Sequence, residues 1–196
     1  MLTFALPSFR SPQIVPTIRA VAVYGRAWLL ACALAFSVQA ALAGETINIP
    51  DSTVTFEAPT SFTPLTPEEI AAKYLRARPP KYVIGNARRT TSIGYDILPR
   101  PIKDAELEQG LDIFGTFMGR AIANLVWKRK EIVEMQGQRW IWLEMTSSAI
   151  DTDIYNIMLI TPFDGRMVIF NFNSTKEEFA QNEAALRASV ASIRLK

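Results

Sequence analysis

The stretch from Gln138 to Phe172 constrains the fold of this chain more than any other. Within it, Asp164-Gly165 lies between two apolar runs, Ile154–Phe163 and Met167–Phe172. Asp-Gly readily supplies the positive φ angles of a type I′ turn, so the two runs are predicted to form a β-hairpin. The preceding segment, Gln138–Met145, has the period-two pattern of a further strand.

Both faces of these predicted strands are apolar. In Gln138–Met145 the aliphatic side chains and the tryptophans fall on opposite faces, and both faces of the hairpin strands are apolar as well. A strand that is apolar on both sides is covered on both sides. We therefore predict an α+β fold, an α/β/α sandwich with a central, mainly antiparallel sheet.

Three helices are expected to cover this sheet. Thr66-Pro67-Glu68-Glu69 combines an N-cap, a Pro at the first helical position and a capping-box Glu, and Thr175-Lys176-Glu177-Glu178 repeats the box before the last helix. The longest predicted helix begins at Asp104 and ends near Leu125. Its apolar side chains recur every three or four residues, at Leu107, Leu111, Phe114, Met118, Ile122 and Leu125.

We expect the core to form where the sheet meets the Leu111–Ile122 part of that helix. The strand residues predicted to pack there are Leu143, Ile157, Leu159 and Val168. The same helix contains Gly110, Gly115 and Gly119, each of which costs about 1 kcal/mol relative to Ala in a helix interior. We attribute the three glycines to close packing of the helix on the sheet.

Residues 1–43 have the pattern of a secretory signal peptide. They contain three Arg and no Asp or Glu, and their apolar core, Ala27–Phe36, is too short to span a bilayer comfortably. Ala41-Leu42-Ala43 then provides a small-residue cleavage site. We predict export to the periplasm with cleavage after Ala43, or after Ala40 as the second choice.

Two alternatives would leave the chain anchored to the membrane. The leader could remain uncleaved, or Cys32 could carry a lipid, since Leu29-Leu30-Ala31-Cys32 superficially resembles a lipoprotein box. Against lipidation, the apolar region continues beyond Cys32.

Residues 44–196 contain neither His nor Cys. Their composition excludes His-based and thiol nucleophiles, thiol redox chemistry and an ordinary zinc site. Asp151-Thr152-Asp153 lacks the Gly and the downstream acidic ligand of an EF-hand loop, and it is typical of a turn. We expect no catalysis, no cofactor and no metal site, and we keep a carboxylate-based hydrolase as the alternative.

A basic segment is the first candidate for binding. Seven basic residues oppose only Asp96 there, which suggests contact with an acidic envelope protein or with anionic lipid headgroups. The simpler interpretation is neutralisation by acidic residues elsewhere in the chain, such as Glu106, Glu108 or Glu177. The basic residues are Arg76, Arg78, Lys81, Arg88, Arg89, Arg100 and Lys103.

Trp140 and Trp142 are the second candidate, because they share one face of a predicted strand. Either they pack beneath a helix or they form a partly open aromatic platform for a protein or a glycan. The sequence pI of about 8.8 reflects in part the basic leader, so it does not indicate a nucleic-acid partner, and we expect none.

Several short motifs carry a family resemblance over residues 46–194. They are Phe56-Glu57-Ala58-Pro59, Thr91-Ser92-Ile93, Gly137 before Trp140, Asp164-Gly165-Arg166 and Ala188-Ser189-Val190. With these motifs, the chain resembles the superfamily of PsbP-like proteins, Mog-type import factors and bacterial DcrB-like periplasmic proteins. The resemblance implies one α/β/α domain over residues 44–196 and accessory, partner-binding roles rather than catalysis.

Together these observations predict an exported, non-catalytic accessory protein that binds another envelope protein. The alternatives are a carboxylate-based periplasmic hydrolase and a membrane-surface component that recognises anionic envelope material.

Overall fold

The computed structural model describes residues 44–74, 78–149 and 152–196. They belong to the second of two compact units, Leu42–Lys196. The predicted signal peptide and Cys32 lie outside the described residues. None of the helices in the described ranges combines the length and the apolar character needed to cross a membrane.

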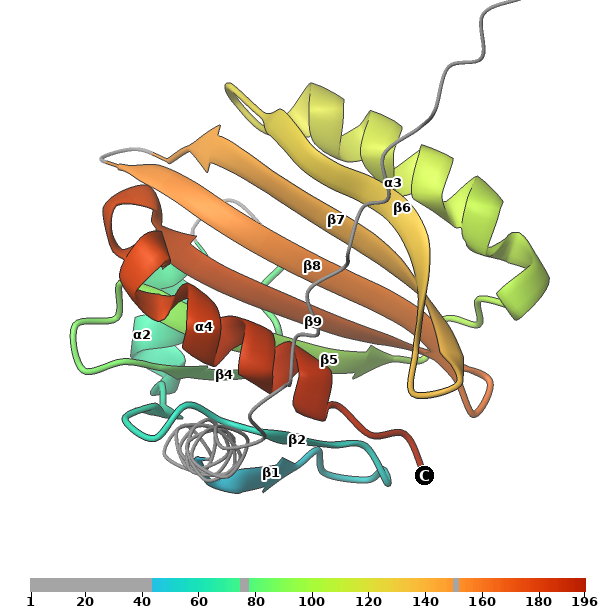
Figure 1. Cartoon of the computed structure of the whole chain (residues 1–196), viewed down its shortest axis with the longest axis horizontal. Helices are drawn as coiled ribbons and strands as arrows, with labels where there is room; N and C mark the ends of the chain where they lie inside the picture. The colour runs from blue at the N-terminus through green and yellow to red at the C-terminus, as the bar shows by residue number, and fades with distance from the viewer. Residues whose placement is uncertain (1–43, 75–77, 150–151) are drawn as a thin grey trace, which may run out of the picture. The chain divides into compact units, whose positions relative to one another are not determined.

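The described strands form a seven-stranded antiparallel sheet and a separate two-stranded sheet (Figure 1). In the larger sheet the spatial order is β3-β4-β5-β9-β8-β7-β6. The smaller sheet pairs β1 (Thr46–Asn48) with β2 (Thr55–Glu57). The strands of the larger sheet are β3 (Thr63–Pro64), β4 (Tyr82–Gly85), β5 (Thr91–Leu98), β6 (Val126–Met135), β7 (Gln138–Ser148), β8 (Asp153–Phe163) and β9 (Arg166–Thr175).

The predicted hairpin is confirmed as β8 and β9. Asp164 has a φ of 50° and Gly165 a φ of 67°, which are the positive values that a type I′ turn requires. The two strands then pair from Phe163 opposite Arg166 to Ile154 opposite Thr175. The turn therefore sets which side chains of β8 and β9 share a face.

Helix α2 (Pro67–Lys73) begins with the predicted capping box. The backbone N–H of Glu69 donates to Oγ1 of Thr66 at 3.2 Å, and the backbone N–H of Thr66 donates to Oε2 of Glu69 at 2.8 Å. Helix α3 (Leu107–Ala121) follows a single 3₁₀ turn, η2 (Asp104–Glu106), and ends where the backbone of Ile122 becomes extended.

The capping box predicted for α4 (Lys176–Ser192) is wrong. Thr175 is the N-cap residue, but its side chain makes no capping hydrogen bond. The carboxylate of Glu178 instead accepts from Oγ1 of Thr90 at 2.6 Å and pairs with Arg88 at 2.9 Å. Contacts with the β4–β5 loop therefore take the place of the local cap.

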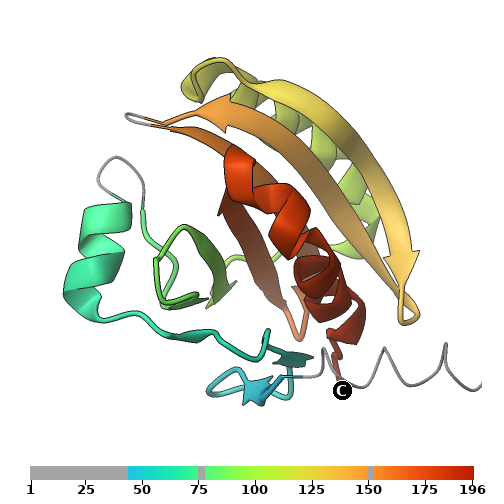
Figure 2. The ribbon, with the colours of Figure 1, turned by 60° about the vertical axis from the view of Figure 1, so that its left-hand side comes forward.

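Two helices pack on opposite faces of the sheet, as the predicted sandwich requires (Figure 2). Helix α4 packs against β8, β9 and β5 and also contacts β2, whereas α3 packs against β6 and β7. The α+β class and the α/β/α sandwich are thus confirmed, although each helix covers only part of its face of the sheet.

The core has two parts, and this corrects the predicted single core beneath α3. Leu143 is buried on the α3 side of the sheet. Ile157, Leu159 and Val168 are equally buried, but they belong to the cluster on the α4 side. Successive residues of a strand point to opposite faces, so the strand register separates Leu143 from the other three.

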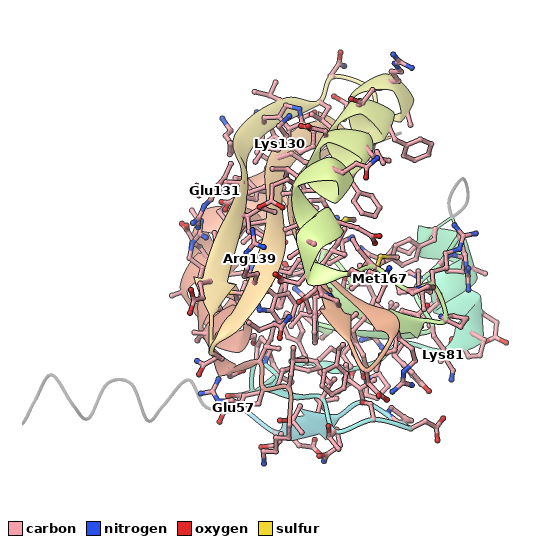
Figure 3. All side chains as sticks on the ribbon, turned by 90° about the vertical axis from the view of Figure 1, so that its right-hand side faces the viewer. Glu57, Lys81, Lys130, Glu131, Arg139 and Met167 are labelled. Carbon is pink, nitrogen blue, oxygen red and sulfur yellow. The ribbon has the colours of Figure 1, made fainter. Side chains whose placement is uncertain are left out.

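Close packing on the sheet explains two of the three glycines of α3. A Cβ at Gly110 would lie 3.1 Å from Cδ1 of Ile141, and one at Gly115 would lie 3.0 Å from Cδ of Lys130. Figure 3 shows Lys130 beside α3. A Cβ at Gly119 would meet nothing within 4 Å, so packing does not explain that glycine.

Candidate functional site

The two central residues of the basic segment are neutralised within the chain. Arg88 pairs with Glu178 at 2.9 Å, and Arg89 pairs with Glu69 at 2.9 Å. Arg89 also donates to Oγ1 of Thr63 and to nearby backbone carbonyls. These two ion pairs agree with the interpretation that acidic residues elsewhere in the chain neutralise the basic segment. The acidic partners are Glu178 and Glu69 rather than the residues that we expected.

The other described basic residues do not join Arg88 and Arg89 in one patch. Arg88 and Arg89 precede β5, whereas Arg100 and Lys103 follow it. At about 3.3 Å per residue, the eight residues of β5 separate these two groups by roughly 26 Å. Arg78 and Lys81 precede β4, while Arg76 lies outside the described residues. The basic segment is therefore divided between the two ends of β5.

Trp140 and Trp142 do not form the open aromatic platform that was one alternative for them. Trp140 is 2% exposed and Trp142 is 6% exposed, both within the α4-side core. The indole N–H of Trp142 donates to Glu144 at 2.9 Å, and the guanidinium of Arg129 lies 4.3 Å from the centre of the Trp142 ring. Neighbouring side chains therefore enclose both rings.

Glu144 is the centre of a buried polar cluster beside these tryptophans. Its carboxylate accepts from Nη2 of Arg187 at 2.8 Å and from the hydroxyl of Tyr155 at 2.5 Å, in addition to Trp142. Burial raises the pKa of Glu144, but these hydrogen bonds outweigh burial and hold the pKa below its ordinary value. Burial, followed by the bond to Glu144, raises the pKa of Tyr155 to about 12. The cluster is a satisfied structural tie between β7, β8 and α4.

Asp153, from the predicted turn, is also held by structural partners. Its carboxylate accepts from Oγ of Ser148 at 3.0 Å and from Nζ of Lys176 at 3.3 Å, and these hydrogen bonds lower its pKa. Asp151 lies outside the described residues. In the described part of the chain, no three acidic residues are grouped so that they could hold a metal ion.

A different surface is left accessible at the middle of the sheet. Along β9, the residues that point toward α4 are buried, whereas Ile169, Asn171 and Asn173 on the opposite face are half-buried. Helix α3 lies on that opposite side, but its main contacts are with β6 and β7 rather than with β8 and β9. We call this surface the open sheet face, and it consists of Asn156, Met158, Ile169, Asn171 and Asn173.

Strand register places these five side chains next to one another. Asn156 lies opposite Asn173, and Met158 lies opposite Asn171. Nδ2 of Asn173 donates to Oδ1 of Asn156 at 2.8 Å. That bond leaves one amide donor group on Asn156 and one carbonyl acceptor on Asn173 without a partner among the described residues. The open sheet face thus combines two apolar side chains with amide groups that can bond to a peptide backbone.

One margin of the open sheet face contains polar atoms that lack partners. The hydroxyls of Tyr74 and Ser92 and Oδ1 of Asn171 are buried and make no hydrogen bond to any described residue. The Tyr74 hydroxyl would lie 3.2 Å from a Cβ at Gly94, the residue that lies opposite Asn171. A buried polar group without a partner costs about 1–3 kcal/mol, and a water or a ligand atom often satisfies such groups.

Burial raises the pKa of Tyr74 to about 12. The neighbouring Ser92 hydroxyl reduces that shift. This margin therefore contains buried polar atoms, and its tyrosine is protonated at neutral pH.

Sequence reasoning missed the open sheet face. Its only signal is the presence of Asn171 and Asn173 at alternate positions of an otherwise apolar strand. Such an alternation indicates that one face of the strand is more polar than the other. Whether a helix covers that face depends on where α3 packs, and the local pattern does not contain this information.

No protein-family model and no curated protein sequence matches this chain. Among solved structures, it is similar to the solution structure of cyanobacterial PsbP (CyanoP) from Synechocystis, with a TM-score of 0.55 and 11% sequence identity. The match covers 79% of this chain and 94% of CyanoP. The fold is PsbP-like. This finding confirms the fold that the resemblance to PsbP-like and DcrB-like proteins implied.

Two further structures share the PsbP-like fold. One is LpqN, described as involved in cell envelope biogenesis of Mycobacterium tuberculosis, with a TM-score of 0.51, 12% identity, and coverage of 76% of this chain and 88% of LpqN. The other is a Bacteroides thetaiotaomicron protein, with a TM-score of 0.52, 11% identity, and coverage of 79% of this chain and 49% of that one. At these identities the likeness establishes the fold alone.

Proposed function

We propose that this PsbP-like chain is an exported, non-catalytic accessory protein of the cell envelope that binds another envelope protein. The open sheet face is the observation that carries the proposal. The predicted leader supports export, and the PsbP-like fold of LpqN provides an envelope-related precedent for this architecture.

The chemistry of the open sheet face suits a protein segment. Met158 and Ile169 offer apolar surface that a partner would remove from water. The amides of Asn156 and Asn173 lie beside that surface and keep a donor group and an acceptor for a partner, whereas Oδ1 of Asn171 is buried. An apolar centre with hydrogen-bonding groups around it is the usual composition of a protein–protein interface.

Four of the described acidic residues are engaged with structural partners, which supports binding over hydrolysis. A carboxylate-based glycosidase needs one carboxyl group with a raised pKa as its general acid. Hydrogen bonds hold four described carboxyl groups below their ordinary pKa instead, and each of these groups has a structural partner. They are Glu69, Glu108, Glu144 and Asp153.

Photo-crosslinking in cells tests the proposal directly. A crosslinking residue at Met158 is expected to capture one discrete envelope protein. The matched control carries the same residue at Gln181, which is exposed on α4. The proposal is wrong if position 158 gives no adduct, or if positions 158 and 181 capture the same proteins equally.

A substitution provides the complementary measurement. Met158→Glu introduces a charge into the centre of the contact, so we expect the captured protein to be lost from co-purification with this variant. Gln181→Glu adds the same charge outside the face and should leave co-purification unchanged. Equal melting temperatures of the two variants would show that the loss does not come from unfolding.

A further inference from the structure

The outer face of α3 carries two strongly exposed apolar side chains. Ile113 is 58% exposed and Phe117 is 69% exposed, and among the described residues only Val126 is a comparably exposed large hydrophobic residue. Phe117 follows Ile113 by four positions, so both lie on the same side of the helix. We call this side the outer α3 stripe, and it comprises Gln109, Asp112, Ile113, Thr116, Phe117 and Arg120.

Two opposite charges of the outer α3 stripe have no ionic partner in the described part of the chain. Asp112 and Arg120 form no ion pair there, whereas the nearby Asp104 and Glu108 both pair with Arg139. Asp112 precedes Thr116 by four residues, and Arg120 follows Thr116 by four residues. Thr116 therefore lies midway between the two charges. Along the stripe, the negative charge precedes Thr116 and the positive charge follows it.

We propose that the outer α3 stripe binds the same stripe of a second copy of this chain. The two helices run antiparallel about a twofold axis at Thr116, so that each Asp112 faces Arg120 of the second copy. A twofold interface repeats every contact, and the arrangement forms two ion pairs at once. Each pair lies about 6 Å along the helix from the axis, since a helix rises 1.5 Å per residue.

The same register brings the apolar residues together. Phe117 is one residue from the axis, so the Phe117 rings of the two copies meet beside it. Ile113 of each copy then lies next to Phe117 of the other. Aromatic residues at the centre of an interface, with charges around them, supply most of the binding energy of many complexes.

This inference does not depend on the proposed function. The outer α3 stripe lies on the side of α3 opposite to its buried residues Leu107 and Met118, which pack toward the sheet. The open sheet face belongs to β8 and β9, so none of its residues takes part in the proposed contact. The contact area of a single helix face is small, so the association should be weak and dependent on concentration.

Sedimentation equilibrium of the form isolated from the envelope, up to about 0.5 mM, tests the proposal. The wild-type chain is expected to dimerise. Phe117→Ser should weaken dimerisation at least tenfold. Asp112→Arg and Arg120→Asp should each do the same, because each places like charges opposite one another. The double variant Asp112→Arg/Arg120→Asp restores opposite charges and should dimerise nearly as well as wild type.

Gln181→Arg, on the exposed side of α4, is the matched control and should dimerise like wild type. Thermal unfolding of every variant separates loss of association from loss of folding. A wild-type chain that stays monomeric overturns the proposal, as does a dimer that none of the stripe variants weakens. A monomer that binds anionic lipid vesicles through Phe117 would also overturn it, since the occupant of the stripe would then be a membrane.

Discussion

Arg187 on α4 donates to the buried carboxylate of Glu144 on β7 across 2.8 Å. Two strands separate β7 from β5 in the sheet, and α4 packs against β5, β8 and β9. The ion pair therefore extends the attachment of α4 toward the β6–β7 side of the sheet. The same carboxylate accepts from Trp142 and Tyr155, so one acidic side chain connects three elements of the PsbP-like fold.

Removing Arg187 should therefore destabilise the domain. Arg187→Ala leaves the carboxylate of Glu144 buried with one charged donor fewer, and we expect a loss of about 1–3 kcal/mol in the free energy of unfolding. The control is Glu183→Ala, which breaks only the partly exposed i, i+4 pair with Arg187 and should cost about 0.3–0.5 kcal/mol. Denaturant unfolding measures both values, and equal losses would contradict this account.

Stability should fall in acid, in part because of Glu144. Its pKa is lower in the folded chain than the ordinary value of 4.5, so its contribution is complete above that value. The contribution is lost as the pH falls through the folded-state pKa. Glu144→Gln should thus flatten the decline of unfolding free energy below about pH 4.5. A decline as steep as that of wild type would show that other carboxyl groups account for it.

Two glycine substitutions should have opposite effects. Gly165→Ala places a Cβ on a residue with a φ of 67°, which costs about 1–2 kcal/mol. Gly119→Ala adds a methyl group near the end of α3 where nothing lies within 4 Å, and it should stabilise the domain by about 0.4–1 kcal/mol. Thermal and denaturant unfolding of the two variants, at concentrations where the chain is monomeric, checks the difference in sign.

Leu159 should be among the costliest single truncations. The residue is fully buried in the α4-side core, so Leu159→Ala should lower the free energy of unfolding by about 2–5 kcal/mol. Ile113→Ala removes a similar side chain from an exposed position and should change stability by less than about 0.5 kcal/mol. A loss below about 0.5 kcal/mol for Leu159→Ala would mean that this side chain is not buried in solution.

The leader predicts the N-terminus of the exported form. N-terminal sequencing of the chain from an envelope fraction should give Gly44 or Ala41, because cleavage follows small residues at these positions. An intact Met1 in that fraction would contradict cleavage.

Local patterns predicted the parts of the fold that local chemistry determines. Asp164-Gly165 predicted the β8–β9 hairpin because only a few residue pairs favour two positive φ angles. Thr66 and Glu69 predicted the start of α2 because the capping box lies within four residues. Strands that are apolar on both faces also predicted a sheet between helices, because this pattern can be read along each strand by itself.

Features that depend on distant residues were not predictable in this way. The sequence predicted that Glu178 completes a capping box at the start of α4. Its carboxylate instead pairs with Arg88 and accepts a hydrogen bond from Thr90, both from the β4–β5 loop. Leu143 and Leu159 look alike in the sequence, yet the register of β7 and β8 places them on opposite faces. The open sheet face likewise results from the position of α3, which no short pattern encodes.

The order of strands in the larger sheet has a consequence for how the chain acquires its structure. One part of the sheet comes from β3–β5 and the other from β6–β9, and the two parts pair only where β5 meets β9. That pairing joins residues as far apart as Thr91 and Ser174, which are 83 positions apart. Contacts between such distant residues form slowly, and β9 is the last strand to be synthesised. The sheet therefore cannot be completed until nearly the whole chain is available, and a chain that still lacks β9 leaves the β3–β5 part and the β6–β8 part of the sheet unjoined.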